Sequence, residues 1–314
     1  MTAASSLNAL SQLEDALTAS SGPKLSVAAY GDSFVGPLFV LKKNTMHIKR
    51  FSGSTAKGLQ NINSVSQTGP RLIQSLDVVL VFGHVDLHIT YLYKALDSQL
   101  TSEKPPEPEA FVRSIFDAYT KFLLDEILPR RKGAGINGEP GYLQGIHIVS
   151  VVMPCVTDEH LDRSAQKYNQ KSQEFRKLQG LRLADSACPT DLATRCKMVH
   201  GFNKMIKDFC RVHKLHYVDL NKHIAPEFGI VHEEYRDVDP STIHVKWEPT
   251  IQFWVKELAN TGLTMDDVDP SIDETLVEYE LSKMDRMAKT DKFNSSMGIV
   301  TGERCVSTQD RFVL

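Results

Sequence analysis

The sequence predicts a three-layer α/β/α sandwich built on a five-stranded parallel sheet. Short apolar runs typical of strands recur along the chain, and the later ones are separated by long segments with helical periodicity. The runs at 76–83 and 145–152 are apolar on both faces, as strands are when helices cover both sides of a sheet. Because crossovers between parallel strands are right-handed, these observations leave few arrangements other than a doubly wound sheet.

Each strand is predicted from a run of β-branched, aromatic and other apolar residues that ends in a turn signal. The five runs are KLSVAAYG (24–31), TMHIKRFS (45–52), LDVVLVFG (76–83), GIHIVSVV (145–152) and LHYVDL (215–220). Helices are predicted where apolar residues recur at helical spacing, at 109–128, 192–213 and 249–259.

A main domain with two extensions accounts for the whole chain. We place the main domain at 23–262, after a polar and helical N-terminal extension at 1–22. Acidic, turn-rich sequence follows the main domain, and then an amphipathic helix, so 263–314 is predicted to be a helical C-terminal extension and tail. The apolar positions of that helix are Val277, Leu281, Met284 and Met287.

The segment 153–190 is predicted to be an insertion within the main domain. It is highly charged over 156–180, yet it carries one apolar stripe at helical spacing. The stripe consists of Leu161, Ala165, Tyr168 and Phe175. We interpret it as a helix that packs on the body of the domain, with a cap over the site or a dimer contact as the alternatives.

Composition argues against several classes of partner. The chain of 314 residues has a formal net charge of −3, which is not the basic field that nucleic-acid binding needs. No apolar stretch has the length of a membrane span, and the N-terminus lacks the pattern of a secretory signal, so we expect a cytoplasmic protein. The five cysteines are odd in number and form no CxxC pair, so neither a disulfide framework nor a zinc site is predicted.

Ser33 follows the first predicted strand, in the stretch VAAYGDSFVG. Ligands of parallel α/β sheets gather at the carboxyl ends of the strands, where this serine is expected to lie. Gly31 permits a tight bend, Asp32 can bond local backbone, and Pro37 suits the first turn of a following helix. Taken alone, Gly-Asp-Ser is either ordinary turn chemistry or the presentation of a nucleophile.

Three further loops bring polar groups to the same edge. Gly53 follows the second strand, and Gly83 and Asp86 follow the third. His244 stands in the last loop, DVDPSTIHVKWEP, directly before the last helix. Polar groups at four loops of one sheet edge favour the nucleophile interpretation of Ser33.

In order and spacing these blocks resemble the SGNH/GDSL hydrolase superfamily over about residues 23–262. The matching residues are Ser33 in the nucleophile block YGDSF, Gly53 in the glycine block, Gly83 and Asp86 in the third block, and His244 before the final helix. The resemblance implies a flavodoxin-like sheet and acyl transfer from an ester without cofactor or metal. In that chemistry His244 takes the Ser33 proton, and the N–H groups of Ser33 and Gly53 stabilise the oxyanion.

Two positions depart from the family pattern. The asparagine of the third block, an oxyanion donor, falls on Val85, so His84 or another group is expected to substitute for it. The carboxylate three residues before the histidine falls on Ser241. We expect Asp239, with Asp237 as the fallback, to orient the imidazole in its place.

The stretch HVDLH offers a competing metal-site hypothesis. His84, Asp86 and His88 alternate, and on an extended segment all three would share one face. The segment is predicted to straddle a bend after the third strand, which disfavours this arrangement. The preferred interpretation gives Asp86 a structural role, bonding backbone amides of the Ser33 loop.

The sequence thus predicts a serine esterase-like hydrolase that cleaves a small acyl ester, an acylated metabolite or glycan, through an acyl-enzyme. One alternative is an acyltransferase on the same site, in which an alcohol or amine replaces water. The other is a degenerate scaffold that binds a glycan or partner without turnover, as the residues at Val85 and Ser241 allow. The sequence makes no prediction of oligomeric state.

Overall fold

The structure is a computed structural model. The described residues are 27–42, 45–51, 53–60, 75–101, 104, 107–132, 135–136, 139–140, 142–169, 177–226 and 229–271. The N-terminal extension expected at 1–22 and the amphipathic helix expected from Val277 to Met287 lie outside these residues.

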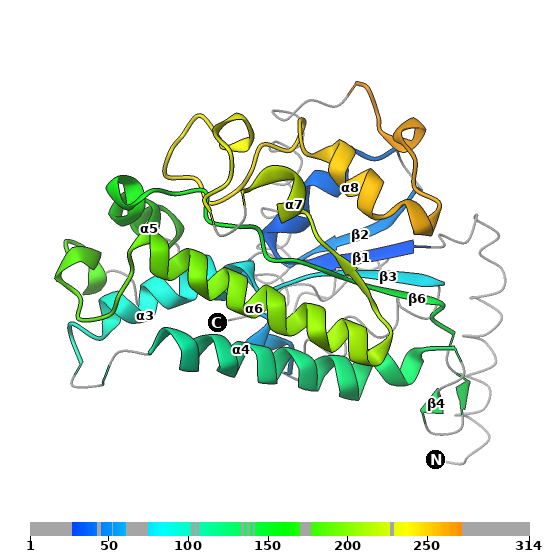
Figure 1. Ribbon diagram of the computed structural model, residues 1–314, viewed down its shortest axis with the longest axis horizontal. Helices are drawn as coiled ribbons and strands as arrows, with labels where there is room; N and C mark the ends of the chain where they lie inside the picture. The colour runs from blue at the N-terminus through cyan, green and yellow to red at the C-terminus, as the bar shows by residue number, and fades with distance from the viewer. Residues whose placement is uncertain are drawn as a thin grey trace, which may run out of the picture.

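Five parallel strands form the central sheet (Figure 1). They are β1 (Val27–Gly31), β2 (His47–Arg50), β3 (Asp77–Val81), β6 (Gly145–Val149) and β7 (His216–Val218). Their order is β2-β1-β3-β6-β7, the order of a doubly wound flavodoxin-like sheet. The predicted fold class is confirmed, and each strand lies inside the run that predicted it. A separate antiparallel pair joins β4 (Gly135–Ile136) and β5 (Glu139–Pro140).

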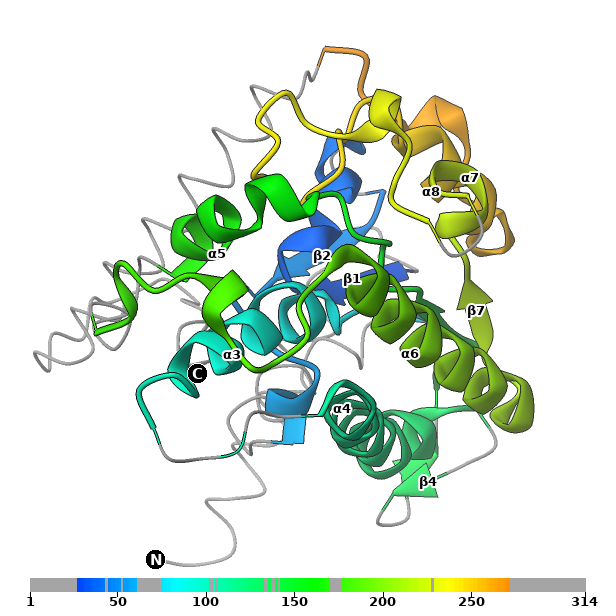
Figure 2. The same ribbon diagram turned by 60° about the vertical axis from the view of Figure 1, so that its left-hand side comes forward.

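Helices cover both faces of the sheet. In Figures 1 and 2, η1 and α8 lie over one face, and α4 and α6 lie over the other. The helical elements are η1 (Ser33–Val40), η2 (Lys57–Gln60), η3 (Asp86–Thr90), α3 (Tyr91–Asp97), α4 (Pro108–Phe122), η4 (Leu123–Ile127), η5 (Leu128–Arg130), η6 (Asp158–His160), α5 (Leu161–Asn169), η8 (Leu183–Asp185), α6 (Leu192–His213), α7 (Asn221–Ile224), η9 (Glu233–Tyr235), α8 (Ile251–Glu257), η10 (Ala259–Thr261) and η11 (Met265–Asp267). Among these described helices, none combines the length and the apolar character of a membrane span.

Local signals set the ends of the two long helices. The Asp191 side chain caps α6 by accepting a hydrogen bond from the Thr194 amide at 2.9 Å, and Lys214 ends the helix in the left-handed region at φ 54°. Pro108 begins α4 at a position where its missing N–H costs nothing, and the chain continues through η4 and η5. The helix predicted at 192–213 therefore has its predicted bounds.

Two asparagines satisfy the backbone where the chain leaves β6. Asn203 accepts a hydrogen bond from the Val151 amide at 2.8 Å and donates to the Val151 carbonyl at 2.7 Å. Asn221 accepts from the Met153 amide at 2.8 Å. Buried backbone groups need such partners, so these side chains fix the path from the sheet into the segment that begins at 153.

The stretch after Gly262 packs on the end of η1. Lys42 donates its amide proton to the Asp267 carbonyl at 2.8 Å, and Asp269 donates to the Val40 carbonyl at 2.8 Å. Leu263 is buried. These contacts place residues up to Asp269 on the same body as the sheet.

Candidate active site

Ser33 is held at the carboxyl end of β1 by close packing. A Cβ on Gly31 would lie 2.7 Å from the Val81 Cβ and 2.8 Å from the Val81 carbonyl oxygen, so only glycine fits there. The next residue, Asp32, caps η1 by accepting a hydrogen bond from the Phe34 amide at 2.9 Å. Ser33 is consequently the first residue of η1, and its amide has no hydrogen-bond acceptor among the described residues.

The structure brings Ser33 and His244 together. His244 Nε2 lies 2.7 Å from Ser33 Oγ, although 211 positions separate the two residues in the sequence. The imidazole is partly buried and packs against the Phe34 ring, with 4.6 Å between the ring centroids. The dyad therefore has the distance that proton transfer from serine to histidine requires.

The other nitrogen of the imidazole faces a tyrosine. His244 Nδ1 lies 3.4 Å from the Tyr168 hydroxyl oxygen, which also accepts a hydrogen bond from the Ile243 amide at 3.2 Å. Tyr168 belongs to α5, and it was predicted from the sequence only as part of an apolar stripe. Its spacing from the family blocks carries no signal that would have singled it out.

The surroundings of His244 keep its ring neutral. Burial is the largest cause that lowers its pKa, and the positive charges of Arg50 and Lys167 lower it further, to about 3. A neutral imidazole is the form that accepts a proton, so at neutral pH His244 is ready to act as a base.

Asp239 does not reach His244. Its Oδ1 accepts hydrogen bonds from the Ser241 amide at 3.0 Å and from the Ser241 hydroxyl at 2.7 Å, while its Oδ2 lies 3.1 Å from Lys167 Nζ. These hydrogen bonds and the ion pair lower the pKa of the Asp239 carboxyl. In the described part of the chain, neither Asp239 nor Asp237 hydrogen-bonds to the imidazole, because the turn through Ser241 and the cation on α5 hold the carboxylate elsewhere.

His84 is completely buried rather than open to a substrate. Its ring stacks on Phe34 with 4.0 Å between centroids, and its Nδ1 lies 3.4 Å from Asp32 Oδ2. The expectation that His84 contacts the substrate as an oxyanion donor is therefore corrected: the turn at Gly83, with φ +107°, turns the chain so that this ring lies under η1. Val85, where the resemblance would place an asparagine, is also buried.

Gly53 lies in the turn after β2. It is exposed and has φ +76°, and a Cβ added there would meet no atom within 4 Å. The left-handed backbone, and not a shortage of space, is thus the reason for glycine at this position. Its role as an oxyanion donor stays a prediction.

Asp86 is a buried structural carboxylate, but its partners differ from those expected. Its Oδ2 accepts a hydrogen bond from the Ala56 amide at 2.6 Å, and its Oδ1 accepts one from the Lys57 amide at 3.5 Å. Burial outweighs these bonds and raises the pKa of the Asp86 carboxyl to about 7. Asp86 therefore fastens the loop after β2, not the Ser33 loop.

The residues of HVDLH do not converge as metal ligands. The segment is helical from His84 onward, so the alternation required for all three side chains to share a face is lost. His88 Nε2 lies 2.9 Å from the Val152 carbonyl, whereas the Asp86 carboxylate binds amides of another loop. Within the described ranges, no group of three suitable side chains is arranged to hold a metal ion.

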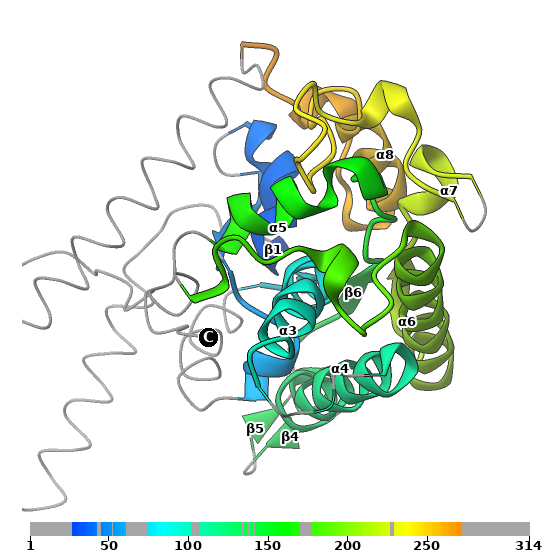
Figure 3. The same cartoon turned by 90° about the vertical axis from the view of Figure 1, so that its left-hand side faces the viewer.

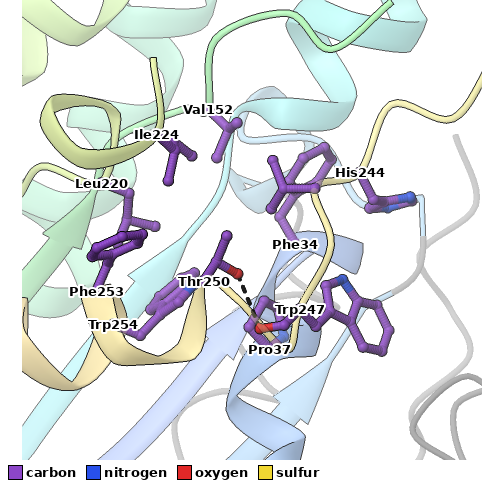
Figure 4. Close-up of a pocket in the computed structure, with 11 residues that line it drawn as sticks. Phe34, Pro37, Val152, Leu220, Ile224, His244, Trp247, Thr250, Phe253 and Trp254 are labelled. Atoms are coloured by element: carbon purple, nitrogen blue, oxygen red, sulfur yellow. Dashed lines mark hydrogen bonds between the residues drawn. The ribbon is translucent and has the colours of Figure 1, made fainter. Parts of the chain in front are cut away.

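An apolar pocket adjoins the dyad. Figure 4 shows Phe34 and His244 at one end of it and Leu220 and Phe253 at the other. The complete lining is Phe34, Pro37, Val152, Leu220, Ile224, His244, Val245, Trp247, Thr250, Phe253 and Trp254. The histidine of the dyad thus borders an apolar wall built largely by α8 and the segment before it.

No protein-family model and no curated protein matches the sequence. Similar solved structures include a GDSL-like lipase from Bacteroides thetaiotaomicron, with 11% identity over 79% of this chain and 95% of that one, at a TM-score of 0.40. A carbohydrate acetylesterase family member from Sinorhizobium meliloti shares 14% identity over 75% of this chain and 96% of that one, at a TM-score of 0.40. An extracellular lipase from Streptomyces rimosus shares 10% identity over 75% of this chain and 98% of that one, at a TM-score of 0.37. At such TM-scores these likenesses assign no function to this chain.

Proposed function

We propose that the protein is a serine hydrolase that cleaves a small acyl ester at Ser33. The observation that carries the proposal is the 2.7 Å contact between Ser33 Oγ and His244 Nε2 at the carboxyl edge of a parallel sheet. A serine beside a neutral imidazole is an activated nucleophile. The resemblance of the sequence blocks to SGNH/GDSL hydrolases adds to this proposal.

The first half of the reaction forms an acyl-enzyme. His244 Nε2 accepts the Ser33 proton as Oγ attacks the ester carbonyl carbon, and the electrons of the carbonyl double bond move onto oxygen. The Ser33 amide, at the start of η1, is the first donor proposed for that oxyanion, and the Gly53 amide is the second. When the tetrahedral intermediate collapses, the alcohol leaves with the proton from His244 Nε2.

The second half returns the enzyme to its starting state. Water attacks the acyl carbonyl while His244 Nε2 accepts its proton, and collapse releases a carboxylic acid and restores the Ser33 hydroxyl. The substrate class proposed is the ester of a small acyl group on a metabolite or a glycan. No step requires a cofactor.

One observation favours a second candidate, a scaffold that binds such an ester without turnover. Val85 replaces the family's side-chain oxyanion donor, and His244 faces a hydroxyl in place of a carboxylate. Removal of one oxyanion donor costs on the order of 10²–10³ in rate in enzymes where it has been tested. A binder and a slow enzyme are separated by measuring turnover.

The test is hydrolysis of p-nitrophenyl acetate and p-nitrophenyl butyrate by the purified chain. Wild type is expected to hydrolyse one or both and to show an acyl adduct on Ser33 by mass spectrometry, while Ser33→Ala loses both signals. Ser114→Ala is the matched control, because among the described residues that hydroxyl bonds only the Phe111 carbonyl, inside α4. A folded wild type that hydrolyses no faster than Ser33→Ala would contradict the hydrolase and favour the binder.

A further inference from the structure

We propose that the Tyr168 hydroxyl, supplied by α5, is the positioning group of His244 and stands where the family resemblance places a carboxylate. The proposal rests on the proposed function, because it concerns how the base of that reaction is oriented. Tyr168 does not contact the reacting atoms, and its effect reaches Ser33 through the imidazole.

Contacts on both nitrogens and on the ring fix the position of His244. Nε2 lies 2.7 Å from Ser33 Oγ, and Nδ1 lies 3.4 Å from the Tyr168 hydroxyl oxygen. The Tyr168 and His244 rings meet edge to face, with 5.8 Å between centroids and 65° between planes. Phe34 packs on the imidazole as well, so the ring is held between two aromatic side chains.

The base role proposed for His244 requires one particular tautomer of the imidazole. If Nε2 is to accept the serine proton, Nδ1 must carry the ring hydrogen and needs an acceptor. The Tyr168 oxygen can accept two hydrogen bonds and donate one. It accepts one from the Ile243 amide at 3.2 Å, and its other lone pair faces Nδ1.

Lys167 also holds the loop that carries His244. Its Nζ donates to Thr242 Oγ1 at 2.7 Å, and the next residue, Ile243, donates its amide proton to the Tyr168 hydroxyl oxygen. Two neighbouring residues of α5, Lys167 and Tyr168, thus fix the two residues that precede His244.

Tyr168 differs from a carboxylate in having no charge. Burial raises the pKa of its hydroxyl to about 12, so it stays neutral at physiological pH. It can fix the tautomer and the ring angle, but it cannot stabilise the imidazolium by an opposite charge. This agrees with the lowered pKa of His244.

The helix that supplies Tyr168, α5, also binds the Asp239 carboxylate and so keeps it away from His244. Lys167 Nζ and Arg163 Nη2 lie 3.1 Å and 3.5 Å from the Asp239 carboxylate. Figure 3, which views the side of the sheet where the strands end, shows α5 in front of β1. The buried Arg195 holds the chain just before α5. Its Nη1 donates to the Val156 carbonyl at 2.8 Å, and its Nη2 donates to Asp158 Oδ1 at 2.7 Å.

The test compares wild type with Tyr168→Phe, which keeps the aromatic ring and removes only the hydroxyl. The first readout is the ¹⁵N NMR spectrum of the His244 ring at about pH 7. Wild type is expected to show the Nδ1–H tautomer, and Tyr168→Phe a mixture of the two neutral tautomers. The second readout is the rate at which a fluorophosphonate probe labels Ser33, which should fall about 5- to 10-fold because one neutral hydrogen bond is lost.

Tyr142→Phe is the matched control. The Tyr142 hydroxyl is buried without a hydrogen-bond partner among the described residues. Tyr142 precedes β6, so it lies at the amino ends of the strands, whereas Ser33 lies at their carboxyl ends. This variant should change neither readout.

Two results would overturn the role of Tyr168. One is an Nε2–H tautomer in wild type, which needs no variant to observe. The other is a Tyr168→Phe protein with the tautomer and labelling rate of wild type. Failure of the proposed function can be told apart from failure of the role of Tyr168. If the probe does not label wild type, the proposed function fails, but the ¹⁵N spectrum still reports the tautomer of His244.

Discussion

Lys167 Nζ lies 3.1 Å from Asp239 Oδ2, and this ion pair holds a loop carboxylate on α5 instead of on His244. The other carboxylate oxygen is engaged by the amide and hydroxyl of Ser241. The carboxylate that the sequence offers for the dyad is therefore committed to other partners, and a neutral hydroxyl faces the imidazole.

Asp239→Asn is predicted to have little effect on the chemistry at Ser33. Asparagine keeps an oxygen that can accept from the Ser241 amide, so the turn should survive, while the exposed ion pairs with Lys167 and Arg163 are lost. The labelling rate of Ser33 by a fluorophosphonate should change less than about 3-fold, since an exposed ion pair contributes little. Asp237→Asn serves as the control, and a loss of orders of magnitude in Asp239→Asn alone would show that this carboxylate does orient His244.

The pH dependence of labelling should reflect the low pKa of His244. Burial and nearby positive charge lower this pKa to about 3, so the ring stays able to accept a proton well below neutral pH. The labelling rate is expected to be nearly flat from about pH 8 to about pH 5, whereas a histidine of ordinary pKa, about 6.5, would lose about 30-fold over the same range. Circular dichroism at each pH checks the fold. An acidic limb near the ordinary pKa would contradict the proposed environment of the ring.

His88 should make stability depend on pH. Its Nε2 lies 2.9 Å from the Val152 carbonyl, and burial, with the nearby His84, lowers its pKa to about 3. The unfolded chain, in which the pKa of His88 is about 6.5, binds the proton more readily than the folded chain. The stabilisation by the neutral ring is therefore complete above about pH 6.5 and is lost as the pH falls toward the pKa of His88 in the folded chain, about 3.

His88→Gln tests this linkage, because glutamine keeps a donor for the Val152 carbonyl and does not titrate. The difference in unfolding free energy, wild type minus variant, should shrink by up to about 2 kcal/mol between about pH 7.5 and about pH 5. Urea unfolding at the two pH values measures it. A difference that does not change with pH would mean that His88 titrates alike in the folded and unfolded chain.

The sheet was predictable because its signals are local. Each strand is a short apolar run followed by a turn residue, and the buried β3 and β6 are apolar on both faces as central parallel strands must be. The ends of α6 coincide with a capping aspartate, Asp191, and with the left-handed Lys214. Ser33 and His244 were also within reach of sequence reasoning, because a parallel sheet brings separate strand ends to one edge.

The partners of the imidazole were not predictable, because they depend on how α5 packs. Tyr168 meets His244 across 76 positions of sequence, and no spacing rule relates an inserted helix to a loop. Asp239 lies close to His244 in the sequence, but the direction of its side chain is decided by Lys167, which comes from the same helix. His84 was expected at the open edge, and the turn at Gly83 instead places it under Phe34.

The central claim is that His244 activates Ser33, and the most direct measurement is the second-order rate constant for labelling by a fluorophosphonate at about pH 7. Wild type is predicted to acquire one adduct, mapped to Ser33, and His244→Gln to react at least about 100-fold more slowly, the lower end of the contribution of a general base. Ser33→Ala should acquire no adduct. Equal rates in wild type and His244→Gln, or an adduct on another residue, would contradict the claim.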